Sequence, residues 1–482
     1  MMKDLLQQNP ARVTRRALFG STAGGVGPAA LASLLGRDTL AAPPGTAGFP
    51  TSVPRAKRVV MLWQGGGPSQ VDLFDEKPVM RQMAGQDIPE SVRGTTRLST
   101  MSSGYQRWPC LPAIRRFQSY GQCGTRLSQL LPNLGAVADE LCVVRSMRTE
   151  AVNHAPGVTF FMTGSQIPGR PSMGAWLSYG LGCETDNLPA FVVMTSSDKG
   201  KTCGQLFFDY YWGTGFLPSR YQGVRFRNTG DLVPYLNNPA GMSAQSKRVL
   251  LDEVAELNRR HLADYGDPEI ETRIAQYEMA FRMQSSVPEL VDFSGESKSV
   301  VERYGADALV KGTCANNCLG ARRLLERGVR VVQLMHAGWD QHGNLHTQLE
   351  EQCRDTEGPA AALIRDLRER GMLEDTLVVW ACEFGRTPFG QGDPNNPRGR
   401  DHFGRAFTWW LAGGGARPGT VYGETDDFAW NIVRDPVHVH DMQATILHLC
   451  GIDHTRLTFR YQGRQYRLTD IHGEVVQGLL RA

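Results

Sequence analysis

The sequence predicts an α/β fold with a mostly parallel central sheet flanked by helices. In the second half of the chain, segments of helical periodicity alternate with short apolar runs. The predicted helices at 314–327 and 346–370 each lead into such a run, at 329–335 and 376–381. Parallel strands need a long crossover connection, which a helix usually supplies, so this alternation indicates a parallel sheet. Ligands bind such sheets beyond the carboxyl ends of the strands.

Length and composition are those of an ordinary globular protein. The chain has 482 residues, of which 41% are hydrophobic and 21% are charged. The net charge is +3, and residues 1–42 hold five basic and two acidic residues, so the remainder is close to neutral. No basic stretch is interleaved with aromatic residues. The composition therefore favours neither nucleic acid nor an anionic membrane as the partner.

The N-terminus predicts export. The segment TRRALF begins at Thr14, and a weakly apolar stretch rich in Gly and Ala continues to Leu35. Paired arginines before such a stretch are typical of the twin-arginine route. We expect residues 1–42 to be this signal peptide and residues 43–57, rich in Pro and Gly, to be a linker, which places the protein in the periplasm or at the cell surface. A leader that is retained as an anchor is the alternative, and no later run reaches the roughly 18 apolar residues that span a bilayer.

Other apolar runs predict further strands. These runs lie at 58–63, 141–145, 191–194 and 408–412. Between them, residues 200–310 predict an insertion or cap that combines an aromatic-rich segment at 207–226 with two helices over 245–285. Residues 419–426 and 461–476 predict hairpins, the second at the edge of the sheet.

A glycine-rich segment, QGGGPSQVDLFD, follows the first run. Backbone amides in such a segment can bind an anion, so we expect Gly66, Gly67 and Ser69 to contact one. Asp72 and Asp75 are candidate ligands in the same segment. The alternative is a tight turn whose acids are solvated or cap the next helix.

A second polar turn, TEAVNHAPG, precedes a predicted helix that closes at Thr163-Gly164. Asn153 and His154 fall at the start of this helix, where the helix dipole favours an anion or a nucleophile. We therefore expect Asn153 to bind the anion and His154 to be catalytic. The alternative for His154 is a capping or packing role.

Acids and histidines gather at the ends of the runs at 329–335 and 376–381. Only 11 histidines occur in the chain, and four of them lie between residues 330 and 403. The candidate ligands in this window are Asp340, His342, Glu383, Asp401 and His402, because Asp/His pairs bind zinc, manganese and similar ions. The alternative is an internal ion pair between Glu383 and Arg386, with histidines that only hydrogen-bond across loops.

The order of these motifs resembles a known family. The leader, GGGPSQVDLFD, NHAPG, GWDQHGN, EFGRTP, GRDHF and YGETD together resemble the bacterial domain-of-unknown-function family 1501, over essentially all of residues 58–482. The resemblance implies a single domain with the three-layer fold of alkaline phosphatases and sulfatases. It also implies a divalent metal, such as zinc, manganese or calcium, and hydrolysis of phosphate or sulfate esters.

The chain departs from the sulfatase-like pattern at three positions. Gln64 ends the first run where those enzymes carry a metal-binding aspartate. His154 stands nine residues before Thr163, where they carry a Ser, Thr or Cys nucleophile. Glu383 is followed by Phe384 where they carry Asp-His. The resemblance thus implies that one metal site survives and that the usual nucleophile is missing.

The sequence therefore predicts an exported, metal-dependent hydrolase of phosphate or sulfate esters, acting on a small molecule or a glycan. Water, or else His154, is the expected nucleophile, and Glu383 or His154 is the expected general base, with Arg386 a further catalytic candidate. The alternative is a non-catalytic protein of the same fold that binds an anionic glycan or an exported partner protein.

Overall fold

The computed structural model describes residues 45–96, 98–196, 207–228, 232–233, 237–239, 241–393 and 396–482. The predicted signal peptide, residues 1–42, lies outside the described residues, as does the start of the predicted linker. Within the described part of the chain, no helix combines the length and the apolar character needed to cross a membrane.

The described residues form a nine-stranded, mostly parallel sheet. Its strands are β1 (Arg58–Gly65), β4 (Leu141–Arg148), β5 (Phe191–Ser196), β6 (Val224–Phe226), β7 (Val331–Ala337), β8 (Thr376–Ala381), β13 (Phe407–Ala412), β14 (Thr420–Tyr422) and β17 (Val437–His438). The order across the sheet is β14-β4-β13-β8-β1-β7-β5-β6, and β17 also pairs with β4. Within this set only β13 runs antiparallel to its neighbours, β4 and β8. The predicted α/β class with a mostly parallel sheet is confirmed.

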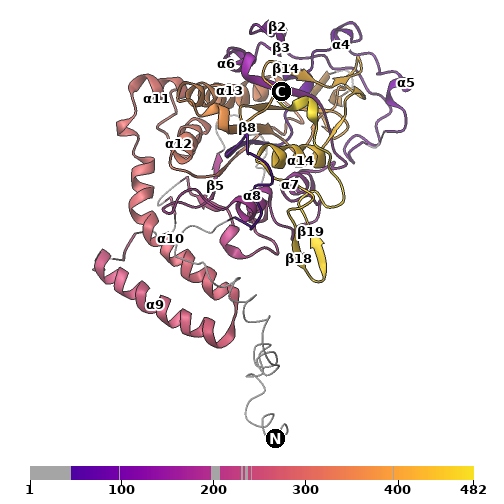
Figure 1. Ribbon diagram of the computed structural model, residues 1–482. Helices are drawn as coiled ribbons and strands as arrows, with labels where there is room; N and C mark the ends of the chain where they lie inside the picture. Colours follow the sequence, from indigo (N-terminus) through magenta and orange to yellow (C-terminus); the bar gives the residue numbers. More distant parts are fainter. Residues whose placement is uncertain are drawn as a thin grey trace, which may run out of the picture.

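Helices cover both faces of the sheet, because successive strand residues point to opposite sides and both sides are apolar. On β1, Val60 and Leu62 belong to one core, and Val59 and Met61 belong to the other. The first core is covered by α6 (Pro132–Gly135), α11 (Lys298–Tyr304), α12 (Cys314–Glu326) and α13 (Leu345–Glu369). The second is covered by α7 (His154–Thr163), α8 (Met173–Leu181) and α14 (Val439–Leu449). Figure 1 shows the two helical layers on either side of the sheet.

The sequence of the covering helices explains why they form, as α12 illustrates. In α12, Cys318, Ala321 and Leu325 recur at helical spacing and are fully buried against the sheet. The side chain of Thr313 accepts a hydrogen bond from the Asn316 amide and so caps the first turn. Burying a side chain such as Leu325 contributes roughly 1.5–3 kcal/mol.

Two long helices project from the body in the region predicted as an insertion. They are α9 (Ala244–Tyr265) and α10 (Pro268–Val291), which are joined through Gly266 in a left-handed conformation. Ala255 is the one described residue of α9 that is buried. Figure 1 shows this helical pair extending away from the sheet, so it does not take part in the edge where the strands end.

The remaining elements are short and connect the layers. They are α3 (Gln70–Leu73), α4 (Pro78–Gln82), α5 (Glu90–Arg93), and the strand pairs β2 (Phe117–Tyr120) with β3 (Thr125–Ser128), β9 (Gly385–Arg386) with β12 (His402–Phe403), β10 (Gln391–Asp393) with β11 (Asn396–Gly399), β15 (Glu424–Thr425) with β16 (Ile432–Arg434), and β18 (Phe459–Tyr461) with β19 (Arg464–Tyr466).

The two predicted hairpins are corrected by these pairings. Residues 419–426 do not pair with each other, because Gly423, with φ of 75°, turns the chain out of the sheet after β14. β14 instead lies parallel to β4. The hairpin predicted in 461–476 is formed by β18 and β19 over residues 459–466, and it is a two-stranded sheet of its own and not an edge of the central one.

Candidate metal centre

Four loops meet where the parallel strands end. β1, β7 and β8 lie side by side, so the segments that leave their carboxyl ends are neighbours. The loop after β7 carries Asp340 and His342, and the segment after β8 carries Glu383. The turn after β4 brings His154 to the first position of α7. The short strand β12 adds His402.

Four side chains converge on one point at this edge. Each of His154, Asp340, His342 and His402 offers one ligand atom, and these atoms lie within 4.8 Å of one another. The Asp340 Oδ1 atom lies 2.8 Å from His342 Nε2 and 3.3 Å from His402 Nε2. The Asp340 Oδ2 atom lies 3.3 Å from His154 Nε2. The cluster therefore presents three imidazole nitrogens around one carboxylate.

In each histidine of the cluster, the Nδ1 atom points away from Asp340, and its hydrogen-bond partner determines which ring nitrogen carries the proton. His154 Nδ1 lies 2.6 Å from Glu383 Oε1, and His342 Nδ1 lies 2.6 Å from Gln391 Oε1. His402 Nδ1 lies 2.9 Å from the Val152 carbonyl oxygen. All three oxygens can only accept, so each Nδ1 carries the hydrogen and, in the neutral ring, each Nε2 carries a lone pair.

Three lone pairs and a carboxylate thus face one another, an arrangement that a cation between them stabilises. His342 Nε2 and His402 Nε2 are only 3.1 Å apart. His154 Nε2 is buried, yet it makes no well-aligned hydrogen bond with any residue that the structure describes. Metal-bound histidines typically donate their other N–H to a carboxylate, amide or carbonyl oxygen, as all three do at this site. The donor set therefore fits a metal ion.

Burial and charge act in opposite directions on these groups. Burial alone would raise the pKa of Asp340, but the close imidazole rings of His154, His342 and His402 together with the Arg386 charge hold that pKa well below its usual range. Burial lowers the pKa of His402 to about 4. Asp340 is therefore ionised and His402 neutral near neutral pH, which are the forms that bind a metal.

Phe384 and Arg386 set the position of the cluster. The Phe384 ring packs on the rings of His154 and His402, with centroids 5.0 and 4.5 Å apart. The Arg386 guanidinium is buried and donates to Asp340 Oδ1. Its other acceptors are the backbone carbonyl oxygens of Gly66, Gly67, Trp339 and Arg400. Arg386, a catalytic candidate in the sequence, is thus placed behind Asp340, where its hydrogen bonds tie the loops together.

Glu383 is placed beside the cluster without facing Asp340. Its Oε1 atom accepts from His154 Nδ1 and, at 2.8 Å, from the Gly66 amide. Its Oε2 atom is buried and has no hydrogen-bond partner among the described residues. The alternative of a Glu383–Arg386 ion pair does not occur, because each of the two pairs elsewhere. Glu383 therefore orients His154 through one oxygen, while its other oxygen contacts no donor among the described residues.

Asp401, a candidate ligand in the sequence, points away from the cluster. Its carboxylate accepts hydrogen bonds from the hydroxyls of Ser99, at 2.5 Å, and Ser102, and from the His402 amide at 2.7 Å. Neighbouring residues of an extended segment point to opposite sides, so His402 and Asp401 cannot both face the same point. Asp401 instead holds the loop that carries Ser99 and Ser102 beneath the site.

The glycine-rich segment serves close packing at the site. Gly66, with φ of +118°, lies so near the loop after β7 that a Cβ atom would be 2.6 Å from the Asp340 amide. Ser69 donates to Asp72 at 2.5 Å, and Asp72 forms a fully buried ion pair with Arg400 at 2.7 Å. In these contacts, neither Ser69 nor Asp72 is directed at the cluster.

Two further candidates from the sequence are Asn153, expected to bind an anion, and Asp75, a candidate ligand. Asn153 is the N-cap residue of α7, but its side chain makes no capping hydrogen bond. Asp75 pairs with Lys77 at 3.0 Å and accepts from the Thr425 hydroxyl. Asn153 lies directly beside a cluster residue, His154.

Two supporting residues escaped the sequence reasoning. Gln391 and the Val152 carbonyl accept from His342 and His402, and nothing in their sequence context distinguishes them from ordinary loop residues. His154 was expected to be catalytic, whereas the structure brings it in as a fourth potential ligand. The sequence feature that indicates a site at His154 is its position at a turn between a strand and a helix.

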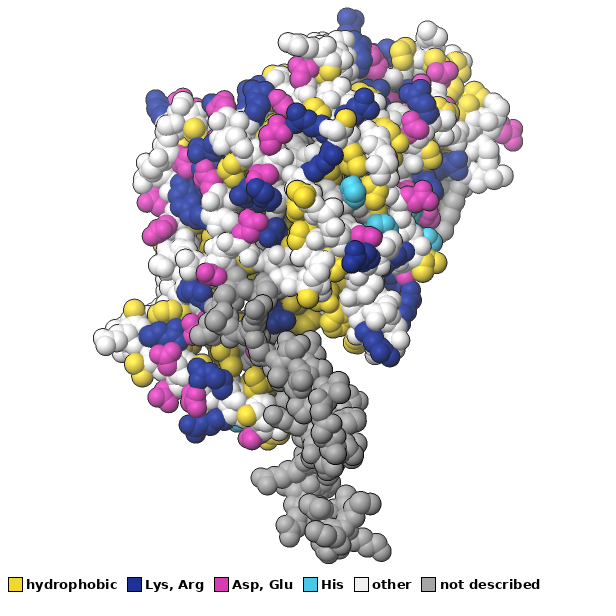
Figure 2. Space-filling view, viewed as in Figure 1, with side chains coloured by type: hydrophobic (Ala, Val, Ile, Leu, Met, Phe, Trp, Pro, Cys, Tyr) yellow, Lys and Arg dark blue, Asp and Glu magenta, His cyan; other side chains and the backbone are white. Residues whose placement is uncertain are grey.

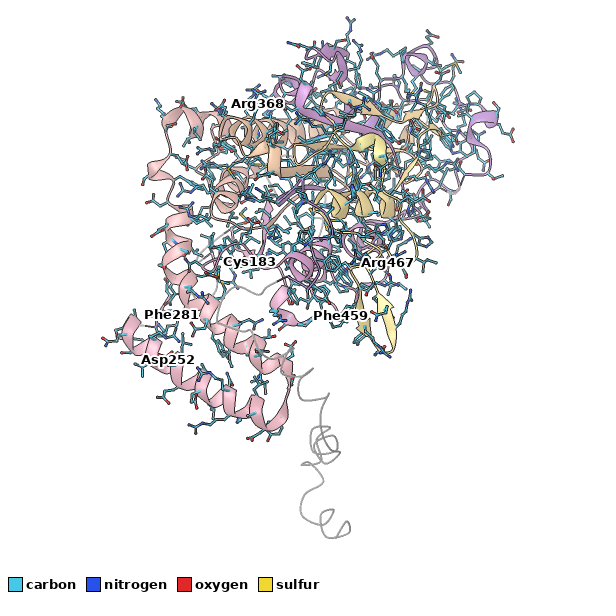
Figure 3. The ribbon with its side chains drawn as sticks, viewed as in Figure 1. Cys183, Asp252, Phe281, Arg368, Phe459 and Arg467 are labelled. Atoms are coloured by element: carbon cyan, nitrogen blue, oxygen red, sulfur yellow. The ribbon has the colours of Figure 1, made fainter. Side chains whose placement is uncertain are left out.

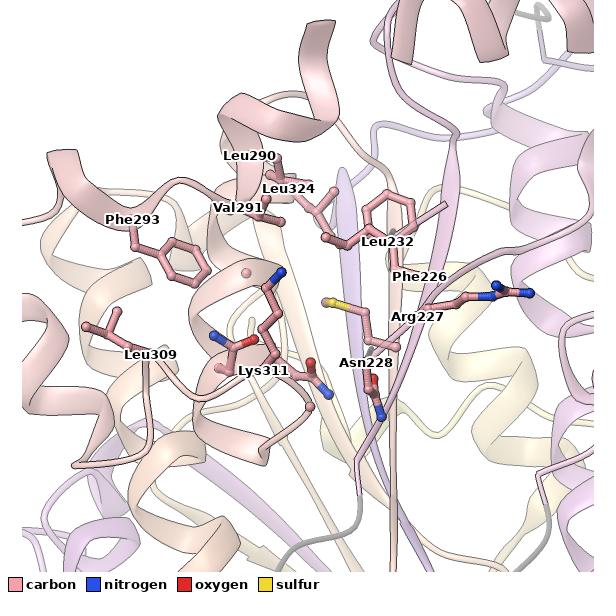
Figure 4. A pocket seen from close by; sticks show the side chains of 15 residues that line it. Phe226, Arg227, Asn228, Leu232, Leu290, Val291, Phe293, Leu309, Lys311 and Leu324 are labelled. Carbon is pink, nitrogen blue, oxygen red and sulfur yellow. The ribbon is translucent and has the colours of Figure 1, made fainter. Parts of the chain in front are cut away.

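A cavity of about 80 Å³ lies elsewhere, between β5, β6 and α12. Leu290, Phe293 and Leu324 are among its apolar walls, and Figure 4 shows the Lys311 side chain reaching into it. It contains no member of the cluster, so the cluster and this cavity are separate features.

Comparisons with known proteins address the family and the fold. A family model described as "Protein of unknown function (DUF1501)" matches residues 56–480. No curated protein sequence matches the chain. Among solved structures, Ps i-CgsB is 9% identical, with 82% of this chain and 72% of that chain covered at a TM-score of 0.35.

Two other solved structures show a comparable likeness. The sulfatase PsFucS1 from Pseudoalteromonas sp. is 12% identical, with 88% of this chain and 70% of that chain covered at a TM-score of 0.33. The C-terminal periplasmic domain of EcEptC from Escherichia coli, in complex with Zn, is 10% identical, with 89% and 97% covered at a TM-score of 0.33. Because these TM-scores are below 0.5, the activity has to be argued from the chain's own residues.

Proposed function

The chain belongs to the DUF1501 family of proteins of unknown function, and from its metal centre we propose that it is a metal-dependent hydrolase of phosphate or sulfate esters. One observation carries the proposal: three imidazoles, each with its proton held on Nδ1 by an acceptor, direct Nε2 at the Asp340 carboxylate. His154, Asp340, His342 and His402 would hold the ion.

The donor set indicates which metal fits. Three imidazole nitrogens and one carboxylate oxygen suit zinc, and also manganese or iron, at a site with tetrahedral or five-coordinate geometry. Calcium binds six to eight oxygen ligands, so this site disfavours it. We propose zinc as the first candidate.

The chain's own groups then define the chemistry. A divalent cation at this site would lower the pKa of bound water towards neutrality and polarise an ester oxygen. Glu383 Oε2, which is buried and lacks a partner among the described residues, is placed to accept a proton near His154. A histidine stands where related sequence patterns carry a hydroxyl or thiol, so water serves as the nucleophile.

Charge at the site favours an anionic ester. Asp340 and Glu383 contribute two negative charges and Arg386 one positive charge, so the side chains alone leave one negative charge. A divalent cation reverses that sign and makes the centre attractive to phosphate or sulfate. The side chains of His154 and His342 are 18% and 27% exposed, so the centre is reached from solvent on their side.

Hydrolysis of aryl phosphate and aryl sulfate by the zinc-loaded protein tests this proposal. We expect the wild type to hydrolyse at least one of the two and the variant His402→Ala to lose at least about 100-fold in kcat/KM, because a metal ligand is removed. His438→Ala is the matched control, since His438 lies outside the cluster and pairs with Glu150. Equal rates for wild type and His402→Ala would remove the centre from the mechanism.

A second candidate function is non-catalytic binding of an anionic glycan or an exported partner protein. The observation that favours it is the number of protein ligands: four fill a tetrahedral site, as in structural zinc centres. Under this alternative, the metal-loaded wild type hydrolyses neither ester, and His154→Ala, which opens one position, creates no activity. Turnover by the wild type decides for the hydrolase.

We propose that the protein works after export, in the periplasm or at the cell surface. This rests on the paired arginines of the N-terminal segment, which lies outside the described residues. The described residues contain no helix able to span a membrane. The substrate would then be a small exported or environmental ester or a glycan ester.

A further inference from the structure

One face of the molecule combines exposed aliphatic side chains with arginines. Ile167 is 75% exposed in the loop between α7 and α8, and Ile471 is 76% exposed after β19. Tyr461, on the hairpin of β18 and β19, is 39% exposed. The arginine face is defined by these three residues together with Arg170, Arg460 and Arg464.

Contacts join these segments into one surface. Asp470, next to Ile471, accepts hydrogen bonds from Arg170 at 2.9 Å and from Arg464. Arg170 also lies over the ring of Tyr466, 5.6 Å from its centroid. The loop of Ile167, the hairpin and the segment of Ile471 are therefore held together. Figure 3 shows Phe459 and Arg467 in this part of the molecule, beside β18 and β19.

Positive charge is in excess on this face. Residues 453–472 contain four arginines and two aspartates. Arg460 is exposed and forms no ion pair with any residue of the described chain, and the Arg464 side chain is 50% exposed although it contacts Asp470. The near-neutral net charge of residues 43–482 conceals this local excess, and the expectation that no basic stretch is interleaved with aromatic residues is wrong for residues 459–467. Figure 2 shows Lys and Arg side chains among hydrophobic ones around the hairpin.

The hairpin that presents these groups is stiffened by aromatic rings. Phe216 stacks on Tyr461 with centroids 5.0 Å apart and planes 14° apart. Phe459 packs on Tyr179 at 5.8 Å. Thr46, next to the first described residue, donates to the Tyr179 carbonyl at 3.0 Å. The described part of the chain therefore begins near this hairpin.

We infer that the arginine face docks on an anionic lipid membrane. Guanidinium groups bind lipid phosphates, while isoleucine and tyrosine side chains enter the region between headgroups and acyl chains. A sugar polymer would use the aromatic rings but has no use for two isoleucines that are three-quarters exposed. The described chain also begins near this hairpin, where Thr46 contacts Tyr179.

Docking in this way leaves the metal centre accessible. His154 opens α7, whereas the loop of Ile167 follows its last residue, Thr163. Ten helical residues separate the two by about 15 Å at 1.5 Å per residue. The face can therefore rest on a membrane while the centre meets its substrate.

Binding of the full chain to vesicles tests the inference. The probes are vesicles of equal parts phosphatidylglycerol and phosphatidylcholine, compared with phosphatidylcholine alone. We expect the triple variant Ile167→Ser, Arg460→Glu and Ile471→Ser to bind the anionic vesicles at least about tenfold more weakly than wild type. Hydrogen–deuterium exchange of the wild type should slow in residues 165–170 and 459–466 on these vesicles alone.

The control carries three matched changes elsewhere, two from an aliphatic residue to serine and one from arginine to glutamate. Val310→Ser, Val433→Ser and Arg259→Glu replace residues that are also exposed but lie outside the arginine face, and this variant should bind as wild type does. Equal binding by the wild type and the face variant overturns the inference, as does an equal loss in the control. Equal protection of the face from hydrogen–deuterium exchange by a soluble sulfated polysaccharide also overturns it, because the surface would then bind polyanions in general and not a membrane.

Discussion

Replacing Asp340 with asparagine is expected to lower the metal content from about one equivalent to below a tenth of an equivalent. Asp340 is the carboxylate on which the Nε2 atoms of all three histidines converge. Its removal takes away the single negative ligand, and loss of a ligand costs more than the 10–100-fold in metal affinity that loss of a supporting residue costs. Elemental analysis of the purified variant provides the measurement.

Asparagine is chosen because it keeps an oxygen that can accept from Arg386. The fold should therefore survive, which circular dichroism and the thermal midpoint would report. His438→Gln is the matched control, since it changes a histidine outside the cluster and should leave the metal content as in wild type. An Asp340→Asn protein that is folded and still holds a full equivalent would mean that the three histidines suffice, contrary to this account.

The second large effect is on stability, and it concerns the ion pair between Arg400 and Asp72 of the glycine-rich segment. Arg400→Met is expected to lower the free energy of unfolding by about 3–5 kcal/mol, because it leaves the Asp72 carboxylate buried without its counter-charge. Both residues are fully buried, and Arg400 donates to both Asp72 oxygens, at 2.7 and 3.1 Å. Urea unfolding of the two proteins provides the comparison.

A double variant separates the lost pair from a simple loss of packing. Asp72→Asn combined with Arg400→Met removes both charges, and we expect it to recover roughly half of the loss. The Ile114 amide can still donate to the asparagine oxygen, and the asparagine NH2 group can donate to the Ser69 hydroxyl oxygen. If the single and double variants are equally destabilised, packing and not charge accounts for the loss.

Much of the fold could be predicted because the sheet is buried on both faces. Such strands are continuous apolar runs, and the run at 376–381 coincides with β8. The long helices α12 and α13 follow from their periodicity and length. The pairing partners were harder, because β13 and β14 are short and join β4 from far along the chain. Nothing local specifies that one runs antiparallel and the other parallel.

The candidate site could be predicted in part for the same reason. Asp340, His342 and Glu383 follow strands that lie on either side of β1, so their proximity follows from a parallel sheet. The orientation of side chains does not follow from the strand order. Asp401 turns to Ser99 and Ser102, and Asp72 turns to Arg400, because each buried carboxylate is satisfied by the nearest donors of an irregular loop. Sequence patterns do not determine such loop contacts.

The roles of His154 and Arg386 show the same limit. Both lie at the site, but which of their neighbours they face depends on details of the turn after β4 and of β9. The Arg386 guanidinium directs all its described hydrogen bonds to Asp340 and to backbone carbonyls, so it supports the loops around the site. His154 faces the ion position that we propose, while Glu383 holds its outer nitrogen.

The central claim is that the cluster of His154, Asp340, His342 and His402 holds one metal ion. Elemental analysis of the wild-type protein, purified without added metal and without chelators, tests it most directly. We predict about one equivalent of zinc, or of manganese or iron, per chain. A total below about half an equivalent of these metals, in a folded protein that also fails to take up zinc on titration, would contradict the claim.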